Sequence, residues 1–277
     1  MIKWYKPRRR PLLRQPVVLV ALGWLVLVGG AALLAPWLAL GDPVVVSAER
    51  VLLSPKADFL LGTDMLGRDV LARLVWGGRW TLGMGLVGLG LAVGLGLPVG
   101  LVSGTVGGWL DVVLMRMVDG MLAFPGLLLA MATIAVLGRS IISVAVAVGL
   151  AAAPAYARVA RSATREVRAQ PYVDAARAIG STEGHVMVRH VLPNVTAPLL
   201  AFAATQLGWI LLNGAALNFL GLGVELGTPE WGAMLADGRG YLRDGPWASA
   251  FPGLALTLTV LAVNLLADGV QEATRPR

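Results

Sequence analysis

The stretch YVDAARAIGSTEGHVMVRHVLPN, residues 172–194, stands out because its polar and basic residues separate two long apolar parts of the chain. Pro171, just before it, suits the first turn of a helix, where its missing backbone donor is not needed. Gly180 readily takes the left-handed conformation that ends a helix. Ser181 is then expected to cap a second short helix, which Pro193 would stop. The pattern predicts two short helices joined by a turn.

This predicted elbow lies between two membrane-long segments, so we expect it to rest on the membrane surface. Asn194 would cap the helix that follows. Two functions fit the spacing: an amphipathic connector bound to lipid headgroups, or a knob that presents the small residues Ala175 and Ala176 to a soluble partner. The apolar side chains expected to anchor the elbow are Val186, Met187 and Val191.

The composition explains why membrane-long segments surround the elbow. Hydrophobic residues make up 57% of the 277 residues and charged residues only 14%, whereas soluble domains average about 45–50% and about 25%. Unpaired backbone groups are costly in lipid, so we expect an all-α membrane bundle. The net charge of +7 is attributed to loops held on the cytoplasmic side, and no nucleic acid partner is expected.

Apolar runs predict about six transmembrane helices, since a helix needs roughly 20 residues to cross about 30 Å of hydrocarbon. The first run is longer than the apolar core of a signal peptide, about 7–15 residues, and is expected to remain as a span. The predicted spans are residues 16–40, 81–106, 121–137, 140–157, 195–220 and 248–267, with an amphipathic lead-in to the third from residue 110.

The distribution of charge predicts the orientation of these spans. With the N-terminus inside, the inner segments hold 15 of the 23 lysines and arginines and a net charge of +8, against −1 outside. The chain then divides into a cytoplasmic tail, a first span, an extracytoplasmic segment, a five-helix core and a second cytoplasmic tail. These parts are residues 1–15, 16–40, 41–80, 81–268 and 269–277, with the cytoplasmic elbow at residues 161–194 of the core.

The second predicted span carries glycines every four residues. Gly96, Gly100 and Gly104 form one series, and Gly90 and Gly94 form another. Small residues at this spacing leave a flat stripe on a helix, which lets another helix approach closely. The neighbour is either a helix of this chain or a helix of another subunit, and the sequence leaves both open.

Residues for catalysis or metal binding form no recognisable site in the sequence. The chain has no cysteine, no GxxxxGK[ST] phosphate loop and no HExxH pair. His185 and His190, its only histidines, are five residues apart and do not share a helix face. We therefore expect a protein that is not an enzyme and that holds neither a metal nor a cofactor.

Few polar residues lie inside the predicted spans. Gln206 and Asn213 are candidates for a substrate pathway, although amides in spans more often pair with a neighbouring helix. Asn218 and Asn264 raise the same choice. An ion-coupled carrier would usually bury ionisable groups in its spans, and their near absence argues against that class.

Two polar sets flank the predicted spans on the outer side, one before the second span and one after the fifth. The residues of these two sets are Thr63, Asp64, Arg68, Asp69, Glu230 and Trp231, and they are candidates for contact with another protein. The carboxylates could instead pair with Arg68 or Arg73 and order the loop from within. Trp231 also suits an anchor at the membrane interface. Internal pairing and partner contact both remain open.

The elbow also resembles a known motif. DAARAIG, followed after nine residues by HVLP, resembles the EAA loop in the membrane subunits of ABC importers. Three further stretches resemble the dipeptide, oligopeptide and nickel branch of that family: LGTDMLGRDVLARLVWGGRWTL (61–82), FLGLGVELGTPEWGAML (219–235) and PWASAFPGLALTLTVLAVNLLADG (246–269). The residues that match the EAA loop are Asp174, Ala175, Ala176, Gly180, Leu192 and Pro193.

The resemblance implies a MetI-like permease subunit in a bacterial or archaeal cell (inner) membrane, with both termini in the cytoplasm. A homologous second permease would complete the pathway for peptides, a related small solute or nickel. Two cytoplasmic ATPases would bind the two elbows through the EAA loop residues, and an extracytoplasmic substrate-binding protein would deliver the cargo. Contact with that binding protein or with the partner permease would then fall to the two outer polar sets: Thr63, Asp64, Arg68, Asp69, Glu230 and Trp231. Membrane lipid would surround the bundle. The alternative is an ion-coupled secondary transporter.

Overall fold

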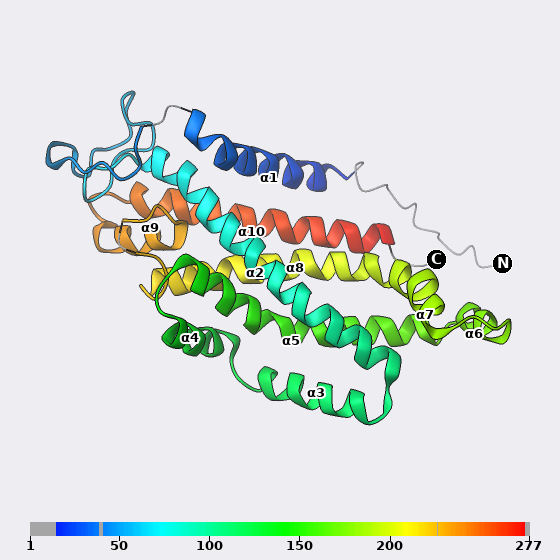
Figure 1. Ribbon diagram of the computed structural model, residues 1–277. Coiled ribbons are helices and arrows are strands. Elements are labelled where there is room, and N and C mark those ends of the chain that lie inside the picture. The colour runs from blue at the N-terminus through cyan, green and yellow to red at the C-terminus, as the bar shows by residue number, and fades with distance from the viewer. Residues whose placement is uncertain (1–14, 39–40, 226, 275–277) are drawn as a thin grey trace, which may run out of the picture.

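The computed structural model describes residues 15–38, 41–225 and 227–274. Most of the predicted N-terminal tail and the end of the predicted C-terminal tail lie outside the described residues. Over the described ranges the chain is a helical bundle without a regular strand (Figure 1). The all-α membrane fold expected from the composition is confirmed.

In the described part of the chain, five helices are long and apolar enough to span a membrane, and a bent pair is a sixth candidate. The long helices are α1 (Pro16–Leu34), α2 (Val70–Val106), α5 (Ile141–Arg168), α8 (Leu192–Phe219) and α10 (Trp247–Thr274). The bent pair is α3 (Gly108–Leu122) and α4 (Gly126–Leu137). The short elements are α6 (Pro171–Ala178), α7 (Glu183–Val186), α9 (Trp231–Gly238), the π-helix η4 (Met187–Val191), and the single turns η2 (Ala35–Trp37), η3 (Ala48–Arg50) and η5 (Arg239–Tyr241).

The third predicted span is broken rather than continuous. The sequence predicts one helix over residues 121–137, but α3 ends at Leu122 and α4 begins after Pro125, at an angle of 89°. Proline disfavours the helical conformation in the residue before it, which explains the break. Gly107 and Gly108 have φ values of 67° and 60° and reverse the chain, so that α3 lies apart at the edge of the bundle (Figure 1).

Other spans extend beyond their predicted ends. α2 begins at Val70, because the carboxylate of Asp69 accepts hydrogen bonds from the N–H groups of Leu71 and Ala72 at 2.8 and 3.4 Å and caps the helix. α5 continues past residue 157 to Arg168. The prediction ended spans near the first charged residues, but helical hydrogen bonds continue across charged residues outside the bilayer.

α2 and α5 pack closely and run in the same direction. A Cβ atom on Gly96 would lie 2.6 Å from the carbonyl oxygen of Ala153, and one on Gly100 would lie 2.4 Å from that of Ala157. Only glycine permits such contact between backbones. The series Gly96, Gly100 and Gly104 therefore packs within this chain.

The second glycine series does not serve this contact. Gly90 and Gly94 have open space where a Cβ atom would lie, so a helix of another subunit remains an open reading for them. α1 is the least buried of the five long helices and lies along α10. There the indole Nε1 of Trp24 donates to the hydroxyl of Thr259 at 3.1 Å.

Candidate functional site

The elbow (residues 161–194) lies at one end of the bundle, together with the first turn of α1 and the last turns of α10 (Figure 1). Its first short helix, α6, begins at Pro171 and ends as predicted, since Gly180 adopts a φ of +91°. The N–H groups of Gly180 and Ser181 donate to the carbonyls of Arg177 and Ala176 at 2.9 and 3.1 Å. These two bonds form a Schellman cap, so the predicted glycine cap is confirmed.

The predicted start of the second short helix is wrong by one residue. Thr182, not Ser181, is the cap, because its hydroxyl accepts a hydrogen bond from the N–H of His185 at 3.3 Å. Ser181 instead belongs to the end of the preceding helix, where its N–H is already used.

The predicted stop at Pro193 is also wrong. α7 continues through η4 into α8, and the N–H of Leu192 donates to the carbonyl of Met187, five residues earlier. This widened turn explains how a helix can pass a proline, which lacks a donor and crowds the preceding turn. Asn194 does not cap a helix either, since its side chain donates to the carbonyl of His190 at 2.6 Å inside the helix.

A hydrophobic plug holds the elbow against the bundle. Val173 and Ala176 of α6, Val186 of α7 and Val191 of η4 are buried together, and Met187 is partly buried beside them. Two of the three predicted anchors are therefore fully buried, but they pack on protein rather than on lipid. Their buried neighbours are Tyr156, Ala160, Val195 and Leu199.

Ion pairs join α3 to the last turns of α5. Asp111 of α3 binds Arg161 and Arg165, with its Oδ2 atom 2.7 and 2.6 Å from their Nη2 atoms. The hydroxyl of Ser103, at the end of α2, also donates to Asp111. One carboxylate therefore ties α2 and α3 to the part of α5 that begins the elbow.

A second group of ion pairs joins the last turn of α5 to α6 and α7. Arg168 donates to Oε2 of Glu183 at 2.8 Å, and Arg177 donates to its Oε1 at 2.9 Å. Arg177 also donates to Asp174 at 2.9 Å. We call the whole series the ion-pair chain: Asp111, Arg161, Arg165, Arg168, Glu183, Arg177 and Asp174. It holds α3, α5, α6 and α7 in one arrangement.

The structure divides the EAA-like residues into a buried half and an exposed half. Ala176 lies in the plug and Leu192 is half-buried, whereas Asp174, Ala175, Gly180 and Pro193 are exposed.

Two apolar residues of the elbow, overlooked in the sequence, are also exposed. Ile179 is 84% and Tyr172 is 43% exposed. Their place within YVDAARAIG was the available signal, because Tyr172 in the first turn of α6 and Ile179 just after its end lie beside the buried Val173 and Ala176 in sequence but are not buried with them. Tyr172 lies beside His190, with ring centroids 6.2 Å apart, whereas Ile179 has no such ring contact within the described residues. Exposed apolar side chains on a rigid base are typical of a contact surface.

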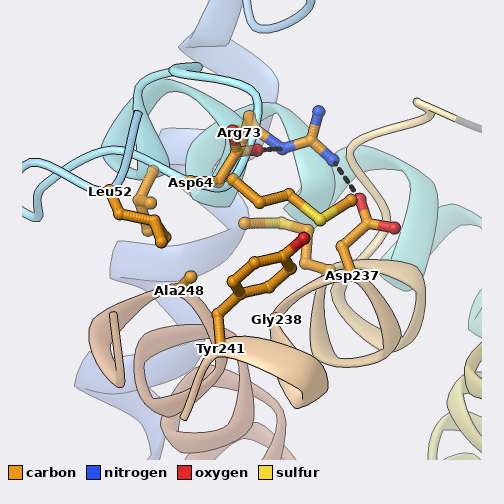
Figure 2. A pocket seen from close by; sticks show the side chains of 10 residues that line it. Leu52, Asp64, Arg73, Asp237, Gly238, Tyr241 and Ala248 are labelled. Atoms are coloured by element: carbon orange, nitrogen blue, oxygen red, sulfur yellow. Dashed lines mark hydrogen bonds and ion pairs between the residues drawn. The ribbon is translucent and has the colours of Figure 1, made fainter. Parts of the chain in front are cut away.

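At the opposite end of the bundle, four charged residues form a buried cluster. Arg68 donates to Asp64 at 2.7 Å and to Asp237 at 3.0 Å. Arg73 lies between the same two carboxylates, at 3.5 and 3.4 Å (Figure 2). The arginine side chains are 3% and 1% exposed. We call these four residues the charged cluster. Asp237 was missed because it is distant in sequence and belongs to no motif.

The remaining candidates before α2 are also held inside the chain. The carbonyl of Thr63 accepts a hydrogen bond from the indole of Trp247 at 2.9 Å, and its hydroxyl accepts one from the N–H of Leu53 at 2.8 Å. Asp69 caps α2, as described above. Internal pairing of this set is thus present, and contact of Thr63, Asp64, Arg68 or Asp69 with a partner stays a prediction.

Glu230 and Trp231 fix the start of α9. The carboxylate of Glu230 accepts hydrogen bonds from the hydroxyl of Thr81 at 2.8 Å and from the N–H of Ala233 at 3.0 Å. It is fully buried, and this burial raises the pKa of its carboxyl group. Trp231 is 2% exposed and donates to the carbonyl of Leu74, so an interfacial anchor is the wrong reading for it.

The amides predicted for the substrate pathway make hydrogen bonds to backbone carbonyls. Gln206 of α8 donates to the carbonyl of Ala152 of α5 at 3.4 Å, and Asn213 donates to the carbonyl of Trp209 in its own helix at 2.9 Å. A role in substrate passage stays a prediction. Over the described residues, no group of three or more His, Cys, Asp or Glu side chains could hold a metal ion.

Comparison with known proteins identifies the family. A family model described as "Binding-protein-dependent transport system inner membrane component" matches residues 96–277, which include the elbow. The chain belongs to this family. The family consists of transporter permeases, not enzymes, and this permease is the membrane-spanning component of a binding-protein-dependent transport system.

Named relatives align with this permease over most of its length. It is 37% identical over 246 residues to the dipeptide transport system permease protein DppC of Alkalihalophilus pseudofirmus, covering 89% of this chain and 81% of that one. It is 40% identical over 260 residues to the di/tripeptide transport system permease protein DppC of Pseudomonas aeruginosa, covering 92% and 86%. The glutathione transport system permease protein GsiD of Escherichia coli is 36% identical over 275 residues, covering 99% and 90%.

A solved structure agrees on the fold. A chain of the inward-facing MetNI methionine ABC transporter superposes on this permease with a TM-score of 0.62 at 22% identity, covering 74% of this chain and 98% of that chain. The MetI-like fold that the EAA-like loop implied is confirmed.

Proposed function

We propose that this permease pairs with a homologous second permease and forms with it the import pathway for peptides. The support for the substrate class comes from the relatives, whose names specify dipeptides, di/tripeptides and glutathione. All of these are short peptides or their close analogues.

The observation that carries the proposed mechanism is the division of the elbow into a buried and an exposed half. Two ATPases bind the elbows of the two permeases, here through the exposed residues Asp174, Ala175 and Ile179. The plug and the ion-pair chain make the elbow rigid, so that it transmits motion of the ATPases to the helix bundle without deforming. Closure of the ATPases on ATP would turn both elbows as rigid bodies and open the pathway to the other side.

The charge distribution supports the orientation that this mechanism needs. Over the whole sequence, the segments predicted to be cytoplasmic hold 15 of the 23 lysines and arginines, and the elbow is one of these segments. This favours the cytoplasm for the end of the bundle where the elbow lies with the last turns of α10. Both termini are then cytoplasmic, in the inner membrane of a bacterial or archaeal cell. The charged cluster and α9 face outward, where a substrate-binding protein delivers its cargo.

Reconstitution into vesicles tests the proposal. This chain alone should neither hydrolyse ATP nor take up peptide. With its two ATPases, the second permease and the binding protein, it should do both. Uptake by the lone chain on an ion gradient would contradict the proposal, and so would a complete assembly that hydrolyses ATP without importing any short peptide.

A further inference from the structure

A hollow of about 770 Å³ lies at the α9 end of the bundle. It opens between the segment after α1, the first turns of α2 and the loop before α9. Its walls are mostly apolar and are formed by Val44, Val46, Leu66, Trp76, Trp80 and Pro229. We call it the tryptophan hollow after Trp76 and Trp80. Val44 is 50%, Val46 is 59% and Trp80 is 43% exposed.

Trp76 and Trp80 belong to the first turns of α2, a candidate span, but lipid does not account for the exposure of the other apolar walls. Val44, Val46 and Leu66 lie between α1 and α2, outside every candidate span of the described chain. Apolar side chains within a span face hydrocarbon, but a contiguous apolar surface outside the spans marks contact with another protein.

Two polar side chains of the hollow offer hydrogen-bonding atoms that suit the backbone of an extended peptide segment. Arg68 and Asp237 reach the hollow from the charged cluster. Among the described residues, the Nη1 atom of Arg68 and the Oδ1 atom of Asp237 make no hydrogen bond with the protein. A donor and an acceptor thus lie close together, as needed for the C=O and N–H groups of an extended backbone. A membrane helix has no such free backbone groups along its side.

The charged cluster also holds two segments that line the hollow. Arg73 donates to the carbonyl of Pro43 at 3.3 Å and to that of Gly227 at 3.1 Å. Pro43 belongs to the segment after α1 and Gly227 to the loop before α9, and both line the hollow. A buried side chain therefore ties these two segments together beside the hollow.

Among the residues that line the hollow, the uncompensated charge is negative. Arg79 does not line it, although its guanidinium carbon lies 5.3 Å from the ring centroid of Trp76. Each arginine of the charged cluster is matched by a carboxylate, whereas Glu225, which also lines the hollow, forms no ion pair within the described residues. A basic side chain on the occupant would meet it favourably.

We infer that the tryptophan hollow receives an extended apolar loop of the extracytoplasmic substrate-binding protein, with a basic side chain of that loop beside Glu225. The inference rests on the proposed function, which places the α9 end outside the membrane. The binding protein is the occupant that arrives from water, the side on which Val44, Val46 and Leu66 lie.

Cysteine labelling of the complete transporter tests the inference, because the chain contains no cysteine of its own. Val46→Cys places a thiol in the hollow. Val45→Cys is the matched control, since Val45 is 57% exposed and does not line the hollow. The binding protein should slow the reaction of maleimide with the Val46→Cys thiol by about tenfold or more, because a docked interface excludes water, and should leave the control thiol nearly unchanged.

Three outcomes would overturn the inference. These are equal labelling with and without binding protein, protection by the second permease alone, and protection by lipid vesicles alone. Peptide uptake by the same preparation separates the two proposals. Uptake without protection refutes only the docking site, whereas absence of uptake from an assembled, ATP-hydrolysing transporter refutes the proposed function.

A charge variant gives an independent measure. Glu225→Gln should weaken binding of the binding protein by several-fold at low salt and reduce its salt dependence. Asp58→Asn is the control. Asp58 is an exposed residue of the segment between α1 and α2 that does not line the hollow, so its substitution should change binding less. Equal effects of the two substitutions would contradict the assigned place of the basic side chain.

Discussion

Gly100 of α2 lies against the carbonyl group of Ala157 of α5, so closely that a Cβ atom at position 100 would sit 2.4 Å from the carbonyl oxygen. The obstacle is backbone and not the flexible end of a side chain. Any larger residue must therefore push α2 and α5 apart. This would weaken the most extensive contact between two helices of the described chain.

Gly100→Ala should destabilise the permease by about 1–3 kcal/mol, the usual cost of overpacking. Gly94→Ala is the control, because Gly94 lies on the same helix with open space beside it. Replacing a glycine inside a helix where space allows should be neutral or stabilising by about 0.5–1 kcal/mol. Thermal unfolding of the purified chain in detergent measures both. Equal shifts for the two variants would show that the contact is not tight.

The glycine series shows how far the sequence could be read. Its spacing predicts a close helix neighbour, and that prediction needs only local geometry. Whether the neighbour belongs to this chain depends on which face α5 presents, and periodicity cannot supply that information. The structure resolves the question for Gly96, Gly100 and Gly104, whereas the open side of Gly90 and Gly94 leaves it unanswered.

The elbow shows the same division between local and long-range signals. Pro171 and Gly180 mark the ends of α6 correctly, since each acts through its own backbone. The predicted helix end at Pro193 was wrong, because a widened helical turn can pass a proline and nothing in the local sequence requires that turn. The ion-pair chain and Asp237 were missed because they join residues that only the fold brings together.

Gly180→Ala should loosen the elbow. Gly180 has a φ of +91°, which costs a residue with a Cβ atom roughly 1–2 kcal/mol. Gly184→Ala is the matched control, because neither glycine has an atom nearby that a Cβ would meet and Gly184 has an ordinary helical φ. Hydrogen exchange should rise over α6 in the first variant only, with a loss of ATP-driven uptake. Unchanged uptake in Gly180→Ala would argue against a rigid elbow.

Glu183→Gln should weaken coupling without unfolding the bundle. The substitution removes the charge that binds both Arg168 and Arg177, so α6 and α7 lose their ionic link to the last turn of α5 while the hydrophobic plug remains. Because Glu183 is exposed and the two arginines are only partly buried, the loss of stability should be small, about 1 kcal/mol or less. Uptake per ATP hydrolysed should fall. Glu166→Gln, an exposed residue of α5 without an ion pair in the described chain, should leave that ratio unchanged, and equal losses would point to a general charge effect.

Arg73→Met should be strongly destabilising. The side chain is 1% exposed and lies between Asp64 and Asp237, so its removal leaves buried carboxylates without part of their compensating charge. Breaking such a pair costs about 3–5 kcal/mol. Arg79→Met, the same change at an exposed site of the same helix, should cost far less. A small effect at position 73, measured by thermal unfolding, would show that Arg68 alone satisfies both carboxylates.

Glu230 should make stability depend on pH. Burial raises the pKa of its carboxyl group above the ordinary value of 4.5, so the folded state favours the neutral form. Its contribution to stability is therefore complete at low pH and is lost as pH rises from 4.5 through the higher folded pKa. The unfolding temperature of the wild-type chain should fall over this window, and Glu230→Gln should reduce the slope. Asp58→Asn, an exposed carboxylate, should leave the slope as it is; an unchanged slope in Glu230→Gln would mean that Glu230 stays ionised when buried.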